Sequence, residues 1–553
     1  MARAISALSA AVALSLAVVT GSTAAAAASS PSKSPPPAAG TRAPAIACTD
    51  LVGLSVPASA IGLQTTGGTV TSASPSASYR GAAYCDVKLA VHPVHVGTPD
   101  ITVGIALPAG WTGTTMMFGG GGYDGSVPDI RNNAPFGDGV QPLDRGMVVY
   151  GSDSGHTNAA TSLPTLDGSF GQDDEALRNF AGDALKKTHD ATAFVVQRYY
   201  GGTQPAHSYF AGGSSGGREA LAVVQRWPAD FDGVIAAYPA YSAATLDLWF
   251  GMMARELAKP GAFPSPTQQK LLYQSVVAAC DGQDGVVDGL VSNPAACHYD
   301  PSVLRCPVGV DPATPTCLSD AMITALKKLS SPWTLPQPTA SGETGYPGFP
   351  LLSGADMTAA LLGYGSQPPA NPMPQTAAYG AQFWDQWVKY FVTRDAGYNS
   401  LSLDPANPGP LQTRIDELTK LQDVNQTDLG AFARRGGKLL MVHGTADELV
   451  SHRATVDYYQ RVQATMGANR TRDFSRLYLV PGAAHANIGG AYYAAWDSVS
   501  ALDTWVSNGT APTNQIVADT TGARTRPLCE YTQYPKYIAG DVNAAASFSC
   551  VTS

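Results

Sequence analysis

The sequence predicts an α/β fold, in which a sheet containing parallel strands is covered by helices. Short apolar segments typical of strands alternate with segments of helical periodicity from residue 46 to about 240. The same alternation returns from residue 429 to 553. The chain has 553 residues, which exceeds one minimal domain, and its hydrophobic content of 44% is sufficient for a large core.

The two blocks define the two halves of the predicted core, 46–240 and 429–553. Helices are expected at 179–200, 218–226, 454–466 and 493–506, where apolar side chains recur at helical spacing. The strands are expected as short apolar runs between turn signals, at 86–93, 101–108, 114–118, 146–151, 208–211, 233–238, 438–443 and 475–481.

Between the two halves, residues 241–428 lose this alternation and become rich in proline and loops. Helices are expected at 267–279 and 319–329, and four of the eight cysteines fall in this stretch. We interpret residues 241–428 as an inserted lid domain over the edge of the sheet that carries the functional site.

The N-terminus indicates an exported protein. Residues 1–29 combine a short basic start, an apolar run and Ala-x-Ala sites, which together are typical of a secretory signal peptide. Residues 30–45 are rich in Pro, Ser and Ala and are expected to form a flexible linker. No other run is long and apolar enough for a membrane span, so we expect a secreted mature form without a membrane partner.

Composition also restricts the partners and the redox state. The net charge is −9 and no Lys/Arg run exists, which argues against a nucleic-acid partner. Eight cysteines in an exported chain indicate disulfides, although the sequence alone does not fix their connectivity. Because they occur in sequence-local couples, we predict the pairs Cys48–Cys85, Cys280–Cys297, Cys306–Cys317 and Cys529–Cys550.

Residues 212–216 match G-x-S-x-G with Ser214 at the centre, between an apolar segment and a helical one. This is the setting of a nucleophile elbow, in which a sharp strand–turn–helix bend exposes the serine and requires small neighbours. The alternative is a structural Gly/Ser turn. The strand–turn–helix setting favours the nucleophile, and with it an α/β-hydrolase fold with a large inserted lid domain.

A serine hydroxyl needs a base and a third group that holds the base, and α/β-hydrolases place them in the order Ser, Asp/Glu, His. Asp447 follows the expected strand 438–443, and His485 follows the expected strand 475–481. Glu448 competes with Asp447 for the acidic role. Two further histidines near Asp447, His443 and His452, have the simpler interpretation of packing or solvated residues.

The negative oxygen of a tetrahedral intermediate requires N–H donors. One expected donor is the backbone N–H of Ser215, which follows the nucleophile. The other is expected from the glycine run 119–122, with Gly121 or Gly122 as the candidates, because glycine allows a close approach of backbone and ligand. An ordinary flexible turn is the alternative for this run.

A second candidate site is the loop 280–290, in which Asp281, Asp284 and Asp288 alternate with glycines. Carboxylate oxygens on a tightly wound loop suit Ca²⁺, although the spacing is not that of an EF-hand. Backbone carbonyls of Val286 and Leu290 are candidates to complete the coordination. A solvated acidic turn is the alternative, but three acids so close together repel one another without a cation.

The elbow block 212–240, the loop 280–290, and the segments 153–156, 443–447 and 480–485 resemble the tannase and feruloyl esterase family of α/β-hydrolases. That family also contains mono(2-hydroxyethyl) terephthalate hydrolases. The resemblance spans about 48–550. It implies a triad of Ser214, Asp447 and His485, a large lid, and a structural Ca²⁺ in the lid. The implied calcium ligands are Asp281, Asp284, Val286, Asp288 and Leu290.

The chain departs from the resemblance at two positions. Most members have a cysteine directly before the nucleophile and another directly after the histidine, joined in a disulfide. Here these positions are Gly213 and Ala486. Without the bridge, Ser214 and His485 must be aligned by packing alone.

The expected activity is hydrolysis of carboxylic esters, with feruloyl, galloyl, benzoyl or terephthaloyl groups, or plant-polymer esters, as substrates implied by the resemblance. Two alternatives remain open, a non-catalytic calcium-stabilised binding protein and a secreted peptidase of the same fold. The lid aromatics Trp384, Trp387 and Tyr390 either supply an apolar wall for an aromatic acyl group or form the lid core.

Overall fold

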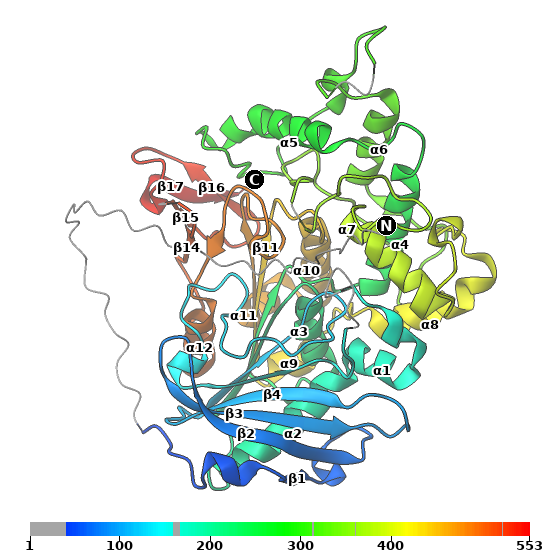
Figure 1. The fold of residues 1–553 in the computed structure, drawn as a ribbon. Helices are drawn as coiled ribbons and strands as arrows, with labels where there is room; N and C mark the ends of the chain where they lie inside the picture. The colour runs from blue at the N-terminus through cyan, green and yellow to red at the C-terminus, as the bar shows by residue number, and fades with distance from the viewer. Residues whose placement is uncertain (1–39, 159–165, 312–314, 360, 523, 553) are drawn as a thin grey trace, which may run out of the picture. The chain divides into compact units, whose positions relative to one another are not determined.

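A computed structural model describes residues 40–158, 166–311, 315–359, 361–522 and 524–552 (Figure 1). The expected signal peptide 1–29 and most of the expected linker 30–45 lie outside these ranges. Within them, no helix is both long and apolar enough to cross a membrane.

The architecture is an α/β-hydrolase fold built on one ten-stranded sheet, with strand order β1-β2-β3-β4-β6-β5-β7-β8-β11-β12. The half from β1 to β4 pairs antiparallel, β6 pairs antiparallel with β4, and the strands from β6 to β12 pair parallel. The strands are β1 (Ser55–Val56), β2 (Gly67–Ala77), β3 (Ala83–His92), β4 (Ile101–Pro108), β5 (Thr114–Phe118), β6 (Val148–Ser152), β7 (His207–Gly213), β8 (Gly233–Ala237), β11 (Lys438–Gly444) and β12 (Ser475–Val480).

Helices cover both faces of the parallel half. In β7, Phe210 belongs to one buried cluster while Tyr209 and Ala211 belong to another, as the two-residue period of a strand requires. Burial on both faces explains why these strands are short, nearly continuous apolar runs. The flanking helices are α1 (Asp174–Arg178), α2 (Ala184–Tyr199), α3 (Ser215–Arg226), α10 (His452–Met466), α11 (Ala468–Phe474) and α12 (Ser498–Asn508).

The segment between β8 and β11 adds no strand to the central sheet, and it contains residues 241–428, which we interpret as a lid (green to yellow in Figure 1). Its two ends meet, because the Asp423 carboxylate accepts hydrogen bonds from the Ala244 amide at 2.9 Å and the Thr245 hydroxyl at 2.7 Å. Its elements are α4 (Ala243–Leu257), α5 (Pro266–Cys280), α6 (Asp320–Ser330), β9 (Trp333–Thr334), β10 (Gly345–Tyr346), α7 (Tyr379–Gln386), α8 (Gln412–Gln422) and α9 (Gly430–Arg434).

The C-terminal region differs from the sequence expectation. The helix expected at 493–506 begins at Ser498, and the residues before it include a short strand of a three-stranded sheet. The additional strands are β13 (Ala494–Ala495), β14 (Ile516–Asp519), β15 (Thr525–Pro527), β16 (Gln533–Tyr537) and β17 (Phe548–Thr552). All eight cysteines are bonded in the sequence-local pairs that we predicted, Cys48–Cys85, Cys280–Cys297, Cys306–Cys317 and Cys529–Cys550.

Candidate active site

Ser214 lies at a sharp bend between β7 and α3. Its φ of 61° and ψ of −123° place a side-chain-bearing residue in a rarely populated region of backbone space. The neighbours must be small, because a Cβ on Gly212 would lie 2.2 Å from the Gly216 carbonyl oxygen. A Cβ on Gly216 would lie 2.6 Å from the Gly120 carbonyl oxygen. The glycines therefore permit the tight bend that presents the serine side chain.

The structure brings the three predicted residues into one hydrogen-bonded chain. His485 Nε2 lies 3.0 Å from Ser214 Oγ, and His485 Nδ1 lies 2.8 Å from Asp447 Oδ2. A carboxylate accepts hydrogen bonds only, so Nδ1 carries the proton in the neutral ring and Nε2 is free to accept from the serine hydroxyl. Asp447 and His485 are both buried, in the loops that follow β11 and β12.

Asp447 is held by four donors. Its Oδ1 accepts from the backbone amides of Leu449 at 2.9 Å and Val450 at 2.8 Å. Its Oδ2 accepts from His485 and, at 3.2 Å, from His443 Nε2, whose N–H is shared with the Val450 carbonyl oxygen at 2.9 Å. Burial alone would raise the pKa of Asp447, but the charge of His485 and the two histidine hydrogen bonds hold this pKa well below its ordinary value. Asp447 is therefore the ionised member of the chain.

The sequence analysis interprets His443, four residues before Asp447, only as a packing or solvated residue. The ring is fully buried, with Nδ1 2.8 Å from the Thr455 hydroxyl. His452 behaves differently, because burial and the charge of His443 lower its pKa to about 3. His452 is thus a neutral packing residue, whereas His443 is a direct partner of the buried carboxylate.

Glu448 and Asp447 contact different parts of His485. The Glu448 carboxylate accepts from the backbone amide of His485 at 3.4 Å, whereas Asp447 contacts the imidazole ring. Burial and the neighbouring charge of Asp447 raise the pKa of Glu448 well above its ordinary value. The geometry therefore favours Asp447 as the residue that orients His485.

The glycine run lies against the elbow. The amide of Gly119 donates to the Ala211 carbonyl at 3.0 Å, and the amide of Gly120 donates to Glu219 Oε2 at 2.9 Å. Since these two amides are engaged, Gly121 and Gly122 are the candidates in the run for binding an oxyanion together with Ser215. The Ser215 hydroxyl donates to the Gly122 carbonyl at 2.6 Å and fixes the loop to the start of α3.

Two buried carboxyl groups lie beneath this loop. A Cβ on Gly120 would lie 2.0 Å from Asp124 Oδ1, and one on Gly119 would lie 2.7 Å from Glu219 Oε2. Burial and the charge of Glu219 raise the pKa of Asp124 well above its ordinary value, and burial raises the pKa of Glu219. Like charges this close disfavour joint ionisation of the two carboxyl groups.

A serine–histidine–aspartate chain at the strand ends of this fold is the arrangement of a serine hydrolase, and the comparison with known proteins shows to which family the chain belongs. The family model described as tannase and feruloyl esterase matches residues 85–551. The chain belongs to the tannase and feruloyl esterase family. It is a carboxylic ester hydrolase, which removes the alternative of a non-catalytic binding protein.

The relatives of this esterase match over nearly their whole length. An uncharacterized esterase of Agrobacterium fabrum is 37% identical, with 91% of this chain and 92% of that protein covered. A probable feruloyl esterase of Arthroderma benhamiae is 31% identical and the mono(2-hydroxyethyl) terephthalate hydrolase of Piscinibacter sakaiensis is 30% identical, each with 86% of this chain and 87% of the relative covered.

Solved structures share the fold. Feruloyl esterase B from Aspergillus oryzae has a TM-score of 0.73 at 22% identity, with 88% of this chain and 98% of that chain covered. Tannin acyl hydrolase from Aspergillus niger has a TM-score of 0.64 at 22% identity, with 88% and 90% covered.

A cavity of about 320 Å³ opens beside Ser214 and His485 of the esterase. Glycines 119–122 form one side, and lid residues Leu362, Tyr379 and Phe383 contribute apolar surface. Trp384, Trp387 and Tyr390, the lid aromatics considered in the sequence analysis, do not line this cavity. Trp384 and Trp387 are fully buried in the lid core, where their indole N–H groups donate to the Ser400 carbonyl at 3.1 Å and the Gln422 side chain at 3.2 Å. Tyr390 is half-buried and packs against the core.

The acidic loop 281–290 carries the features of a cation site. Asp284 is fully buried, and its Oδ2 has no hydrogen-bond partner among the described residues. Burial and the charges of Asp288 and Asp281 raise the pKa of Asp284. The buried Arg526 guanidinium pairs with Asp288, so one cation faces three acids. The residual charge of the loop and the unpartnered oxygen fit a divalent ion, and the carboxylate donor set suits Ca²⁺.

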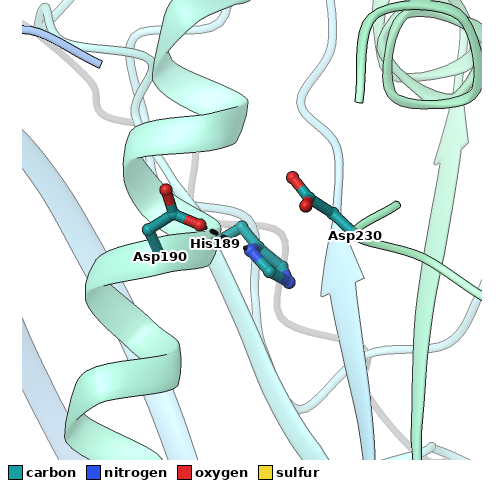
Figure 2. Close-up of side chains that lie close together, drawn as sticks. All are labelled: His189, Asp190 and Asp230. Atoms are coloured by element: carbon teal, nitrogen blue, oxygen red, sulfur yellow. Dashed lines mark hydrogen bonds and ion pairs between the residues drawn. The ribbon is translucent and has the colours of Figure 1, made fainter. Parts of the chain in front are cut away.

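A second group of possible metal ligands lies outside the loop 281–290. Among the described residues, one set of three possible ligands has its ligand atoms all within 4.8 Å of each other, namely His189, Asp190 and Asp230. Figure 2 shows His189 and Asp190 on α2, with Asp230 approaching from the loop before β8. The Lys186 ammonium lies 2.9 Å from a carboxylate oxygen of each aspartate. A lysine therefore already bridges the two aspartates, and the cluster is an ion-pair network.

Proposed function

We propose that this esterase hydrolyses esters of aromatic carboxylic acids through a Ser214–His485–Asp447 triad and an acyl-enzyme. The observation that carries the proposal is the continuous hydrogen-bonded chain from Ser214 Oγ through both ring nitrogens of His485 to Asp447. The chain opens into a cavity that is lined by the glycines 119–122 and by the aromatic residues Tyr379 and Phe383.

In the first half-reaction, His485 Nε2 takes the proton of Ser214 as Oγ attacks the ester carbonyl. The negative oxygen is bound by the amide of Ser215 and by that of Gly121 or Gly122. When the tetrahedral intermediate collapses, the alcohol leaves with the proton from His485. Asp447 stabilises the imidazolium throughout this exchange.

In the second half-reaction, His485 takes a proton from water, which attacks the acyl-enzyme carbonyl. The carboxylic acid leaves, and Ser214 recovers its proton from His485. Atoms balance over the cycle, because one water is consumed and one acid and one alcohol are released.

The aromatic substrate class is supported by two facts. Tyr379 and Phe383 of α7 present aromatic surface to the cavity that contains Ser214. Relatives that match over most of their length are named a probable feruloyl esterase and a mono(2-hydroxyethyl) terephthalate hydrolase. A flat acyl group against Phe383 would bury apolar area and gain ring–ring contact.

The test is a substrate panel of methyl ferulate, methyl gallate, mono(2-hydroxyethyl) terephthalate and a p-nitrophenyl ester, with product identification. We expect turnover of aromatic esters by the wild type, and a loss of about 10⁴-fold or more in kcat for Ser214→Ala. Ser208→Ala in the same strand is the matched control and should remain active. Turnover of peptides without any ester would favour the peptidase alternative and contradict the proposal.

We also propose that the loop 281–290 binds a structural Ca²⁺ through Asp281, Asp284 and Asp288 and the carbonyls of Val286 and Leu290. The unpartnered oxygen of Asp284 and the excess negative charge support it. Calcium should raise the Tm of the wild type after chelation and should not raise that of Asp284→Asn. An equal response of the two proteins, or none in the wild type, would refute the site.

We further propose that the protein is exported, since residues 1–29 have signal-peptide character and the described chain contains four disulfides. Expression of the full chain should yield an extracellular product that begins between about residues 24 and 30. N-terminal mass spectrometry of the secreted fraction would decide this, and an intact N-terminus in the cell would contradict export.

A further inference from the structure

The aromatic ring of Tyr238 lies between the two active-site loops. Tyr238 follows directly after β8, and its amide donates to the Val442 carbonyl in β11 at 2.7 Å. The residue is 6% exposed, and its ring meets the His485 ring edge-to-face, with centroids 4.7 Å apart and an interplanar angle of 62°. On another side it meets Phe136 at 5.0 Å. The ring is thus clamped between a core aromatic and the candidate base.

The backbone of Gly213, next to Ser214, is a third group that packs against the Tyr238 ring. A Cβ at this position would lie 2.4 Å from both Cζ and Oη of Tyr238, which is closer than any real contact. Gly213 is not among the glycines with positive φ, so its backbone conformation is open to other residues. Glycine is required here by the Tyr238 ring. The same collision leaves no room for the cysteine that the family resemblance leads one to expect at position 213.

The loop that carries His485 has a constrained backbone. Ala486 and Asn487, which follow the histidine, both have positive φ, at 52° and 59°. Such conformations persist where the surrounding contacts fix them. The hydrogen bond to Asp447 fixes one edge of the imidazole, and the edge-to-face contact with Tyr238 limits rotation of the ring about that bond. An aromatic contact of this geometry is worth about 0.5–1.5 kcal/mol beyond its buried area.

We propose that Tyr238 is a positioning residue, whose ring, wedged between Gly213 and His485, holds the imidazole at hydrogen-bond distance from Ser214. This inference rests on the proposed Ser214–His485–Asp447 mechanism. The ring and not the hydroxyl performs the function, so phenylalanine is the conservative replacement and leucine the disruptive one.

The first experiment measures kcat, KM and Tm with a p-nitrophenyl ester for wild type, Tyr238→Phe and Tyr238→Leu. The phenylalanine variant should keep kcat within about threefold, because it retains the aromatic contact. The leucine variant should lose about 10- to 100-fold in kcat with KM nearly unchanged, as expected for misalignment of the base. Tyr459→Leu removes a tyrosine that is equally buried in α10 and does not line the cavity. This control should lose Tm and keep kcat.

The second experiment is a double-mutant cycle with Gly213→Ala. In the wild-type background the new methyl group displaces the Tyr238 ring, so kcat should fall about tenfold or more. In the Tyr238→Leu background the space is free, and the same substitution should change kcat less than threefold. This cycle remains informative even when Tyr238→Leu alone is poorly stable.

Two results would overturn the inference. One is a kcat of Tyr238→Leu within threefold of wild type, and the other is an equal loss from Gly213→Ala in both backgrounds. Either leaves the proposed function intact, provided that the wild type hydrolyses the ester and Ser214→Ala does not. An inactive wild type, in contrast, contradicts the proposed function itself and with it this inference.

Discussion

Replacement of Asp447 by asparagine tests the hydrogen-bonded chain most directly, because it preserves shape and removes the charge. Four N–H groups point at the Asp447 carboxylate, from Leu449, Val450, His443 and His485. A carboxylate accepts all four, whereas an amide has only one accepting oxygen. Two of the four donors must therefore face an NH₂ group, in whichever orientation the asparagine side chain settles.

The two orientations have different chemical consequences. With the NH₂ group toward Leu449 and Val450, two backbone donors lose their partner and the loop is destabilised. With the NH₂ group toward the imidazoles, His485 must accept at Nδ1, and its proton moves to Nε2. Nε2 then presents an N–H to Ser214 and cannot take the serine proton. Each lost charge-assisted hydrogen bond costs about 1.5–3 kcal/mol, so two cost about 3–6 kcal/mol.

A loss of the correct tautomer in a triad lowers kcat by about 10⁴-fold, as known from serine proteases. At 1.36 kcal/mol per tenfold, this corresponds to about 5.4 kcal/mol of lost transition-state stabilisation, which is a different quantity from the cost of the lost hydrogen bonds to folding stability. We therefore expect Asp447→Asn to lose about 10³- to 10⁴-fold in kcat with little change in KM.

The assay is steady-state hydrolysis of a p-nitrophenyl ester, with urea unfolding of each variant. Asp519→Asn is the control, since Asp519 is buried, accepts from the Thr521 amide at 3.0 Å and pairs with Arg524 outside the cavity. It should lose stability and keep kcat. A kcat for Asp447→Asn within tenfold of wild type would refute the reasoning, and a large loss in Glu448→Gln would then identify the other carboxylate as the partner of His485.

Three further outcomes are expected. His443→Phe removes one of four donors to Asp447 and should lower kcat about 10- to 100-fold at constant KM, while an unchanged kcat would exclude a role in positioning the carboxylate. Burial and the charge of Glu219 raise the pKa of Asp124 in the folded protein, so the free energy of unfolding should fall as pH rises from the unfolded pKa of about 3.9 toward the folded pKa. In urea unfolding above about pH 3.9 this fall should be smaller for Asp124→Asn than for the wild type, and equal slopes would contradict the argument. Loss of the Cys48–Cys85 disulfide, which spans 37 residues, should lower the free energy of unfolding by about 4 kcal/mol. Loss of Cys306–Cys317, which spans 11 residues, should lower it by about 3 kcal/mol, and the reverse order in urea unfolding would contradict the loop-entropy argument.

The local parts of the site were predictable because they depend on short-range sterics. A sharp turn between strand and helix at the serine requires small residues at positions 212 and 216, and the five-residue pattern 212–216 already shows glycine at both. The fold class followed from apolar runs whose length reflects burial on both faces. The antiparallel half was less visible, since β2 carries polar residues along most of its length and has only a few buried positions.

The choice among neighbouring side chains was not predictable. Asp447 and Glu448 are adjacent carboxylates in a loop, and only the loop conformation decides which one meets the imidazole of His485. The same holds for the lid aromatics, where Trp384 is buried in the core and the preceding Phe383 lines the cavity. Successive side chains along a helix point about 100° apart, and the sequence alone does not show which of them faces the cavity.

The convergence of the three residues of the proposed triad follows from sheet order and register together. Strands β7, β8, β11 and β12 are consecutive neighbours, although about 200 residues of sequence separate β8 from β11. Gly213 pairs with Ala237, Ala237 pairs with Val442, and Gly444 pairs with Val480, so the strands end at nearly the same level. Residues that follow these ends, Ser214, Asp447 and His485, are therefore delivered to one edge of the sheet. Tyr238 follows the end of β8, the strand between the serine and the aspartate, and that position explains how its ring reaches both Gly213 and His485.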